Sequence, residues 1–277
     1  MHVHPGTKEY LVESGGKYIA DAMTYFHKHD IVVSMEEMAD YYRRLDIKAV
    51  LLAWDAETHT GRPPVTNDYV AEAVTKYPDV FIGFASVDPW KGTKAVSELE
   101  RAVKTLGLRG LKCHPIAQGF YPNDRQFYPL WETCSALKIP LLLHTGMTGV
   151  GAGVPGGNGL KLKYAQPIPY IDDIAADFPN LTIIGAHPSW PWQEEMLAVA
   201  VHKTNVYIDL SGWSPKYFPA SLIQHANTRL QDRILFGSDY PFLTPDRWLA
   251  DFEKAGFKPE VYEKILLLNA KRLLGEP

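Results

Sequence analysis

Histidine and aspartate stand at the ends of several short apolar runs in this chain. His2 and His4 are two residues apart in MHVHPG, His144 ends IPLLLH, and Asp239 ends ILFGSD. Residues two apart on a strand point the same way, so the imidazoles of His2 and His4 can hold one ion from one side. His144 can add a third nitrogen and Asp239 a carboxylate oxygen. Three nitrogens and one oxygen suit Zn²⁺, and Mn²⁺, Fe²⁺ or Co²⁺ also fit.

Each of these residues also has an ordinary structural role. An HxH tripeptide is common, a histidine at a strand end can bond to the backbone, and an aspartate can cap a turn. The order along the chain favours a metal site, because His187 also ends an apolar run, TIIGAH. Burying several such side chains together is costly without a partner, and a metal ion satisfies them all. A water on that ion would have its pKa lowered towards about 7.

The elements that must position these residues are short apolar runs that alternate with helical patterns. Strands alternating with helices indicate a parallel sheet, and eight such units in a chain of 277 residues are typical of a (β/α)₈ TIM barrel. We therefore predict an α/β fold of this type as a single domain over residues 1–277. An open doubly wound sheet is the alternative, but no GxGxxG motif follows an early strand. The predicted strands are 1–4, 48–54, 81–87, 109–114, 139–144, 182–187, 206–211 and 234–239. The predicted helices are 35–44, 68–76, 94–105, 128–137, 168–177, 192–202, 219–228 and 259–274.

Composition excludes several classes of protein. Hydrophobic residues make up 46% and charged residues 22%, which argues against disorder, and the formal net charge of −4 gives no basic surface for nucleic acid. No apolar run approaches the roughly 18 residues of a membrane span, and the N-terminal residues lack a signal-peptide core. The two cysteines, Cys113 and Cys134, do not form a disulfide framework. The sequence thus predicts a cytoplasmic protein without a nucleic-acid or membrane partner.

Four motifs resemble a known family. MHVHPG, LLLHTG, IIGAHPSWPW and ILFGSDYPF are similar to the amidohydrolase superfamily, and most similar to its aminocarboxymuconate-semialdehyde-decarboxylase-like branch, called amidohydrolase family 2. The resemblance implies a distorted TIM barrel with one divalent metal, usually zinc and sometimes manganese. It implies that His2, His4, His144 and Asp239 are the metal ligands and that His187 is the catalytic base or the histidine that positions the water. Members of this family often form dimers, so the resemblance allows a homodimer.

The sequence departs from the family at two points. The family's first strand usually begins several residues before the HxH, whereas Met1 directly precedes His2 here, so either the native chain starts upstream or the first strand is short. Some amidohydrolases carry a carboxylated lysine on the fourth strand that bridges two metals. Lys112 is on that strand, but His114 follows it on the same face. We expect one metal, with Lys112 and His114 facing the substrate.

The expected substrate is a small molecule, an unsaturated or aromatic carboxylic acid or its acyl derivative. The region 110–124 resembles the part of this branch that lines the substrate pocket. The predicted substrate-binding residues, at strand ends or in the loops after them, are Lys112, His114, Trp54, Tyr121 and Trp190. The glycine-rich loop 145–166 is long enough to act as a lid or to be a surface insertion. Arg62, Lys161 and Lys163 are candidates to meet an anionic substrate.

Three functions remain open from the sequence. The first is a hydrolase in which metal-activated water attacks a carbonyl while His187 and Asp239 carry protons, Asp239 being both ligand and proton acceptor. The alternative is a non-oxidative decarboxylase that protonates a ring or diene carbon as CO₂ leaves. The third is a barrel that binds a ligand without turnover. The first two use nearly the same residues, so the sequence does not separate them.

Overall fold

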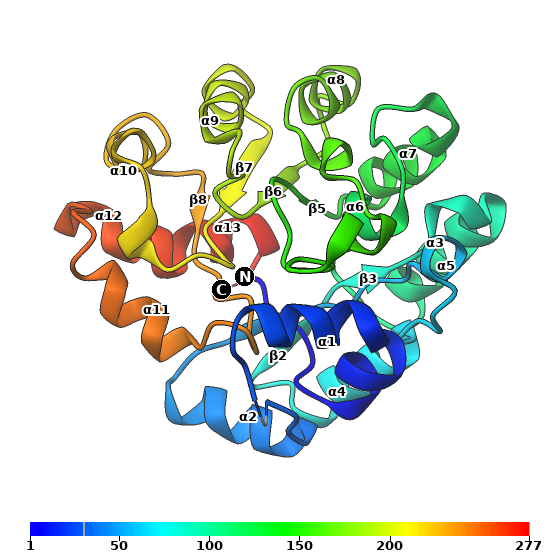
Figure 1. Cartoon of the computed structure of the whole chain (residues 1–277). Coiled ribbons are helices and arrows are strands. Elements are labelled where there is room, and N and C mark those ends of the chain that lie inside the picture. Colours follow the sequence, from blue (N-terminus) through cyan, green and yellow to red (C-terminus); the bar gives the residue numbers. More distant parts are fainter. Residues whose placement is uncertain (30, 277) are drawn as a thin grey trace.

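The apolar runs form parallel strands that are covered by helices on the outside (Figure 1). The computed structural model describes residues 1–29 and 31–276. β1 pairs with β2, and β3 to β8 pair in chain order. The strands are Ala49–Leu51 (β1), Phe81–Gly83 (β2), Ala85–Ser86 (β3), Leu111–Cys113 (β4), Leu141–His144 (β5), Ile183–Ala186 (β6), Val206–Asp209 (β7) and Ile234–Leu235 (β8).

The barrel closes through a single residue, Val3. Its backbone bridges Leu51, the last residue of β1, and Tyr240, in the segment that follows β8, both in parallel. The Val3 N–H donates to the Val50 carbonyl at 3.1 Å, and the Leu52 N–H donates to the Val3 carbonyl at 3.0 Å. The predicted strand 1–4 is therefore reduced to one bridging residue, because Pro5 follows His4 and has no N–H to extend the ladder.

The predicted third strand, 81–87, is divided in two. β2 pairs with β1 and β3 pairs with β4, with Phe84 between the two segments. The Phe84 N–H still donates to the Leu51 carbonyl at 3.0 Å, so the chain continues around the barrel without leaving it. The (β/α)₈ barrel predicted from the sequence is confirmed.

Helices form the outer ring, and most lie where the sequence predicts them. α2 and α7 have the predicted bounds, whereas α1 and α11 were not predicted. A single helix was predicted at 259–274, where the structure has α12, a π-helical turn at Lys264–Leu268 and α13. No helix of the described residues is long and apolar enough to cross a bilayer. The helices are Gly16–Tyr25 (α1), Met35–Arg44 (α2), Glu57–Thr60 (α3), Asn67–Lys76 (α4), Thr93–Lys104 (α5), Pro115–Gln118 (α6), Tyr128–Leu137 (α7), Tyr170–Asp177 (α8), Gln193–His202 (α9), Ala220–Ala226 (α10), Pro245–Phe252 (α11), Pro259–Glu263 (α12) and Asn269–Leu274 (α13).

The alternation of side chains along each strand determines what reaches the barrel interior. In β5, Leu141 and Leu143 pack in the layer between strands and helices, while Leu142 packs inside the barrel. The next inward position is His144, at the end of the strand. In β4, Leu111 and Cys113 face the helices, so Lys112 and His114 face inward. The strand period therefore delivers polar side chains to the carboxyl end of an otherwise apolar barrel.

Candidate metal centre and active site

Three predicted ligands meet at the carboxyl end of the barrel. His2 Nε2 lies 3.3 Å from His4 Nε2 and 3.5 Å from Asp239 Oδ1, and His4 Nε2 lies 3.3 Å from the same oxygen. We call His2, His4 and Asp239 the donor cluster. The backbone holds the donor cluster together, because the Asp239 N–H donates to the His2 carbonyl at 2.9 Å.

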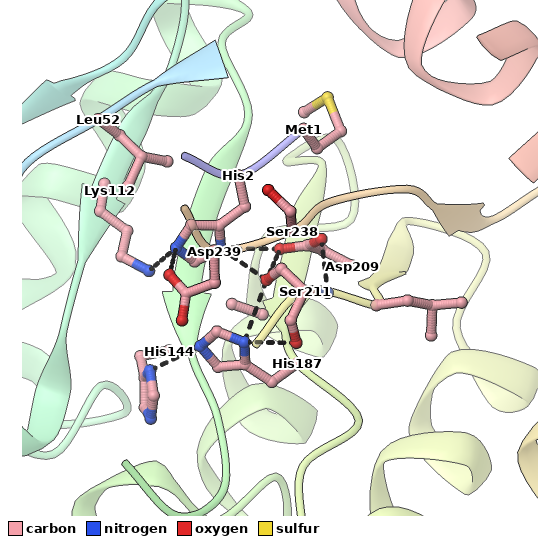
Figure 2. A network of polar contacts seen from close by, with 12 residues as sticks. Met1, His2, Leu52, Lys112, His144, His187, Asp209, Ser211, Ser238 and Asp239 are labelled. Atoms are coloured by element: carbon pink, nitrogen blue, oxygen red, sulfur yellow. Dashed lines mark hydrogen bonds and ion pairs between the residues drawn. The ribbon is translucent and has the colours of Figure 1, made fainter. Parts of the chain in front are cut away.

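Partners on the far side of each ring determine which nitrogen carries the proton. His2 Nδ1 lies 2.7 Å from Asp209 Oδ2, and His4 Nδ1 lies 2.9 Å from the Leu52 carbonyl oxygen (Figure 2 shows the first contact). A carboxylate and a carbonyl accept hydrogen bonds, so each Nδ1 donates and each Nε2 keeps its lone pair. Burial raises the pKa of Asp209, and the hydrogen bond from Ser211 opposes that shift.

The donor cluster has the chemistry of a divalent metal site. Burial and the nearby Lys112 lower the pKa of His2, so its ring is neutral. Burial raises the pKa of Asp239, but the neighbouring His4, His2 and His187 side chains outweigh it and hold the pKa below its usual range. Two imidazole lone pairs and a carboxylate oxygen thus face one another, an arrangement that a cation between them stabilises. The ligand atoms all lie within 4.8 Å of one another, close enough to share one ion.

His144 and His187 lie as a pair beside the donor cluster. His187 Nδ1 lies 2.9 Å from the Ser211 carbonyl oxygen and therefore donates to it, which leaves Nε2 as an acceptor 3.1 Å from His144 Nδ1. The His187 ring lies 5.1 Å from the His2 ring between centroids. His144 Nε2 is buried and has no hydrogen-bond partner. His144 is thus not one of the three mutually close donors. Since its Nδ1 donates to His187, its Nε2 keeps an unused lone pair next to them.

Lys112 lies against the donor cluster rather than in open space. Its Nζ is 3.3 Å from His2 Nε2, and its side chain is fully buried (Figure 2). Burial lowers the pKa of Lys112 to about 8. Within the described residues, the cluster of possible ligands contains His2, His4 and Asp239 and does not include Lys112.

Two site residues adopt a backbone conformation that non-glycine residues rarely take. His187 has φ of 74° and Asp239 has φ of 65°, both in the left-handed region. Such conformations cost on the order of 1–3 kcal/mol and persist where surrounding structure requires them. The backbone of Gly212 (φ 75°) passes so close to both side chains that only glycine fits there. A Cβ would lie 2.6 Å from His187 Nδ1 and 3.2 Å from Asp239 Oδ2. The fold therefore holds these two residues in a strained backbone conformation, which directs their side chains toward the site.

A cavity of about 370 Å³ opens above the donor cluster. His4, His144, His187 and Asp239 line its inner end, and the side walls are largely apolar and aromatic. Tyr10 stacks on the His4 ring at 5.0 Å between centroids and accepts a hydrogen bond from the Trp54 indole. The other walls are formed by Ile19, Ala22, Tyr25, Phe26, His114, Met147, Thr148, Gly149, Val150, Gly212, Trp213, Ser214, Tyr217, Phe242 and Leu243.

Of the five predicted substrate-binding residues, two line the cavity and three do not. Trp54 and His114 line the cavity. The Ala117 N–H donates to His114 Nδ1 at 3.3 Å, so the ring proton is on Nε2, which donates to Thr148 Oγ1 at 3.3 Å. Lys112 is not a lining residue, and its Nζ contacts His2 Nε2 instead. Tyr121 does not line the cavity, because its ring packs on Tyr164 at 4.7 Å and on Tyr170 at 5.1 Å between centroids.

Trp190 and the predicted cations also lie outside the cavity wall. Trp190 is 45% exposed and packs beside Trp213, 5.9 Å away between ring centroids. Lys163 lies over the Tyr121 ring, and Lys161 is not among the lining residues. Arg62 donates to the backbone carbonyls of Val12, Glu13 and Ser14 through its Nε and Nη2 groups, and it is not among the lining residues. The first part of loop 145–166, Met147 to Val150, forms a wall of the cavity.

Sequence reasoning gave no role to several side chains that support the site. Asp209 is the last residue of β7, and Ser211 follows two residues later. The predicted site residues of the other strands also lie at strand ends, so this position was a usable signal. Ser211 Oγ lies 3.1 Å from His2 Nδ1 and 3.0 Å from His187 Nδ1, linking the two rings. Tyr10 and the residues of α1 gave no such signal, because the sequence predicted no helix before residue 35.

Comparisons with known proteins agree with this geometry. A family model described as amidohydrolase matches residues 1–275. The chain belongs to the amidohydrolase family. It is 29% identical over 248 residues to the gamma-resorcylate decarboxylase of Polaromonas sp. (strain JS666), covering 75% of this chain and 74% of that protein. It is 30% identical over 242 residues to the 2-amino-3-carboxymuconate-6-semialdehyde decarboxylase of Dictyostelium discoideum, covering 76% and 65%.

A solved structure shares the fold of this amidohydrolase. It is a dihydroxybenzoic acid decarboxylase from Polaromonas sp. JS666 with bound manganese and the inhibitor 2-nitroresorcinol. The TM-score is 0.67 at 23% identity, covering 99% of this chain and 95% of that one. The named relatives are decarboxylases, so the comparisons favour the decarboxylase alternative over the hydrolase reading that the sequence put first. They do not favour zinc over manganese.

Proposed function

We propose that this amidohydrolase is a metal-dependent, non-oxidative decarboxylase of a small aromatic or unsaturated carboxylic acid. The observation that carries the proposal is the donor cluster at the inner end of an apolar, aromatic-walled cavity, with His187 beside it. The decarboxylase relatives from Polaromonas and Dictyostelium support it. Hydrolysis through the same residues is the competing reaction.

His2, His4 and Asp239 would hold the metal, and His144 is the proposed fourth ligand. When bound, a divalent ion would supply a Lewis acid for the oxygens of the substrate. The nitrogen-and-oxygen donor set suits Zn²⁺ or Mn²⁺, and manganese is the metal in the Polaromonas decarboxylase structure. Asp209 and Leu52 would orient the His2 and His4 rings through their Nδ1 hydrogen bonds.

The chain's own residues would move one proton. In decarboxylation the bond between the carboxylate carbon and the ring or diene carbon breaks, a C–H bond forms at that carbon, and CO₂ leaves. His187 and Asp239 both line the inner end of the cavity, where the reacting carbon would lie. Either side chain can carry a proton taken from solvent to that carbon. His114 lines the cavity and carries its proton on Nε2, and it would hold a substrate oxygen by turning that N–H from Thr148 to the substrate.

The walls of the cavity would assist the loss of CO₂. Trp54, Tyr10 and Phe242 replace water around the substrate with apolar surface. A carboxylate is poorly stabilised in such surroundings, whereas charge that spreads into a ring loses less solvation. The cavity therefore favours the step in which the carboxylate is lost.

The test is turnover by protein reconstituted with Mn²⁺ or Zn²⁺. We expect 2,6-dihydroxybenzoate or a related aromatic acid to release CO₂, with one solvent deuteron on the product carbon when the reaction runs in D₂O. Aromatic thioesters and lactones form the hydrolysis arm of the same panel. Acid release from these compounds without CO₂ from the acids would replace decarboxylation by hydrolysis, and no turnover in either arm would leave a binding protein.

Two variants test the proton carriers. We expect Asp239→Asn and His187→Asn each to lower kcat by about 100-fold or more, the usual scale of a lost general acid or base. Metal content measured on both variants separates the roles, since Asp239→Asn should also weaken the metal site and His187→Asn should not. Turnover near that of the unchanged protein in Asp239→Asn with metal retained would remove Asp239 from the mechanism.

A further inference from the structure

The wall of the cavity opposite the donor cluster is formed mainly by residues near the start of the chain. Ile19, Ala22 and Tyr25 of α1, followed by Phe26, form this wall, and the Phe26 ring meets Phe242 at 5.9 Å between centroids. Gly149 of the loop after β5 completes it, since a Cβ at Gly149 would lie 2.4 Å from the Phe26 ring. We call Ile19, Ala22, Tyr25, Phe26 and Phe242 the distal wall. Its side chains offer hydrocarbon and aromatic surface, with one phenol hydroxyl.

No lysine or arginine lines the cavity within residues 1–29 and 31–276. The cations near it have other partners or positions: Arg62 binds backbone carbonyls, Lys163 lies over Tyr121, and Lys112 is beneath the donor cluster. Lys216 is next to the lining residue Tyr217 in the chain, with its ammonium 4.7 Å from the Tyr217 ring centroid, and it is not itself a lining residue. A second carboxylate on the substrate would therefore be taken out of water without a cationic partner, which is unfavourable.

The cavity is larger than one aromatic ring requires. Its volume is about 370 Å³. An apolar protein cavity of about 150 Å³ already accommodates benzene. With a ring held over the donor cluster, space remains between the ring and the distal wall.

We infer that the substrate is a monocarboxylic aromatic acid that carries an uncharged, apolar substituent on the ring position opposite the carboxylate. This inference rests on the proposed function for the orientation of the acid, and it adds the chemistry of the far end. The donor cluster receives the carboxylate end, and the distal wall receives the substituent. A dicarboxylic acid of the same length is disfavoured because the distal wall gives it no counter-charge.

The experiment measures binding with three probes that carry a nitro group in place of the ring carboxylate, so the enzyme cannot decarboxylate the ring. They are 2-nitroresorcinol, its 5-propyl derivative and its 5-(2-carboxyethyl) derivative, each titrated calorimetrically into the Mn²⁺-loaded protein. Burying a methylene is worth roughly fourfold in affinity, so the propyl probe should bind at least about tenfold tighter than the parent. The acid probe should bind more weakly than the propyl probe by at least about tenfold.

Substitutions in the distal wall should change these ratios in opposite ways. Ala22→Leu fills the space beyond the ring, so the propyl probe should lose most of its advantage while 2-nitroresorcinol keeps its affinity. Phe26 is 42% exposed and tolerates a charge, so Phe26→Arg should shift the ratio of the two long probes towards the acid by about tenfold. Val12→Arg is the matched control, since Val12 is 49% exposed on the same N-terminal segment and does not line the cavity.

The outcomes separate this inference from the decarboxylase proposal. A propyl preference that Ala22→Leu removes and Val12→Arg leaves unchanged supports the inference, whether or not the protein releases CO₂ from any acid. Equal or tighter binding of the acid probe by the unchanged protein overturns it, and so does a failure of all three probes to bind. CO₂ release combined with either of those results would retain the decarboxylase and reject the apolar substituent.

Discussion

Asp209 is buried beneath His2 and accepts hydrogen bonds from three groups. Its carboxylate lies 2.7 Å from His2 Nδ1, 2.7 Å from Ser211 Oγ and, through its other oxygen, 3.1 Å from the Ser211 N–H. A carboxylate in this position orients an imidazole and strengthens it as a ligand. The residue at the end of β7 therefore sets the chemistry of a residue near the N-terminus.

Replacing Asp209 tests that dependence. Asp209→Asn keeps the shape and removes the charge, so we expect metal affinity to fall roughly 10- to 100-fold, the usual effect of losing such a partner. Competition with a chromophoric chelator measures the affinity. Ser211→Ala is the control, because it leaves the contact between Asp209 and His2 and should have the smaller effect. An affinity in Asp209→Asn equal to that of the unchanged protein would show that His2 needs no charged partner.

The two cysteines are predicted to be inert in the folded protein. Cys113 and Cys134 are fully buried, and burial raises the pKa of both thiols above the usual range. The thiolate is the reactive form, so a raised pKa keeps both side chains in the unreactive thiol form at pH 8. We expect iodoacetamide to modify neither residue in native protein and both in urea, as read by mass spectrometry. Rapid labelling of native Cys113 would contradict its outward packing against the helices.

At the scale of the element, the N-terminus of α2 is capped by residues that are close together in the sequence. The Glu37 N–H donates to Ser34 Oγ at 3.1 Å, and the Ser34 N–H donates to Glu37 Oε2 at 2.7 Å, which together form a capping box. α2 then buries Met38, Ala39 and Tyr42 in the layer between helices and strands. This agreement of cap and apolar face explains why its predicted bounds are correct.

Removing the cap should cost a measurable part of the stability. Ser34 is exposed, so Ser34→Ala changes little besides the cap, and we expect the free energy of unfolding to fall by about 1 kcal/mol. Urea unfolding at fixed metal concentration measures the change. Ser34→Asp restores a side-chain acceptor and should recover most of the loss. Equal stability of the alanine and aspartate variants would mean that the cap contributes nothing.

At the scale of the whole molecule, the donor cluster joins distant parts of the chain at the closing point of the barrel. His2 and His4 flank Val3, and the backbone of Val3 bridges β1 to the segment after β8. Asp239 belongs to that segment. An ion bound there would link the two sides of the closure. Binding to the folded state alone stabilises it by about 4 kcal/mol when free metal exceeds Kd a thousandfold.

Metal removal should therefore lower the thermal stability. We expect dialysis against a chelator to lower Tm on the order of 5–10 °C. The His2→Ala/His4→Ala double variant is the control and should unfold at the same temperature with and without the chelator. A chelator effect of equal size in that variant would place the stabilising metal elsewhere.

Much of the site follows from the strand period alone. Because side chains alternate, Leu142 and His144 face inward together, and so do Lys112 and His114, so the ends of the predicted strands already indicate which residues gather. The parallel order of the strands then brings those ends to one mouth. The barrel, the donor cluster and the place of His187 beside it could be predicted for this physical reason.

The walls of the cavity were decided by tertiary structure. Tyr121 and Trp190 are near strand ends in sequence, yet they pack on other aromatic rings outside the cavity. α1 has no catalytic residue in its sequence, yet it forms the distal wall. A strand's period is a property of the covalent backbone, so sequence alone determines which way its side chains point. A loop's course depends on packing against residues far along the chain, which no local pattern contains.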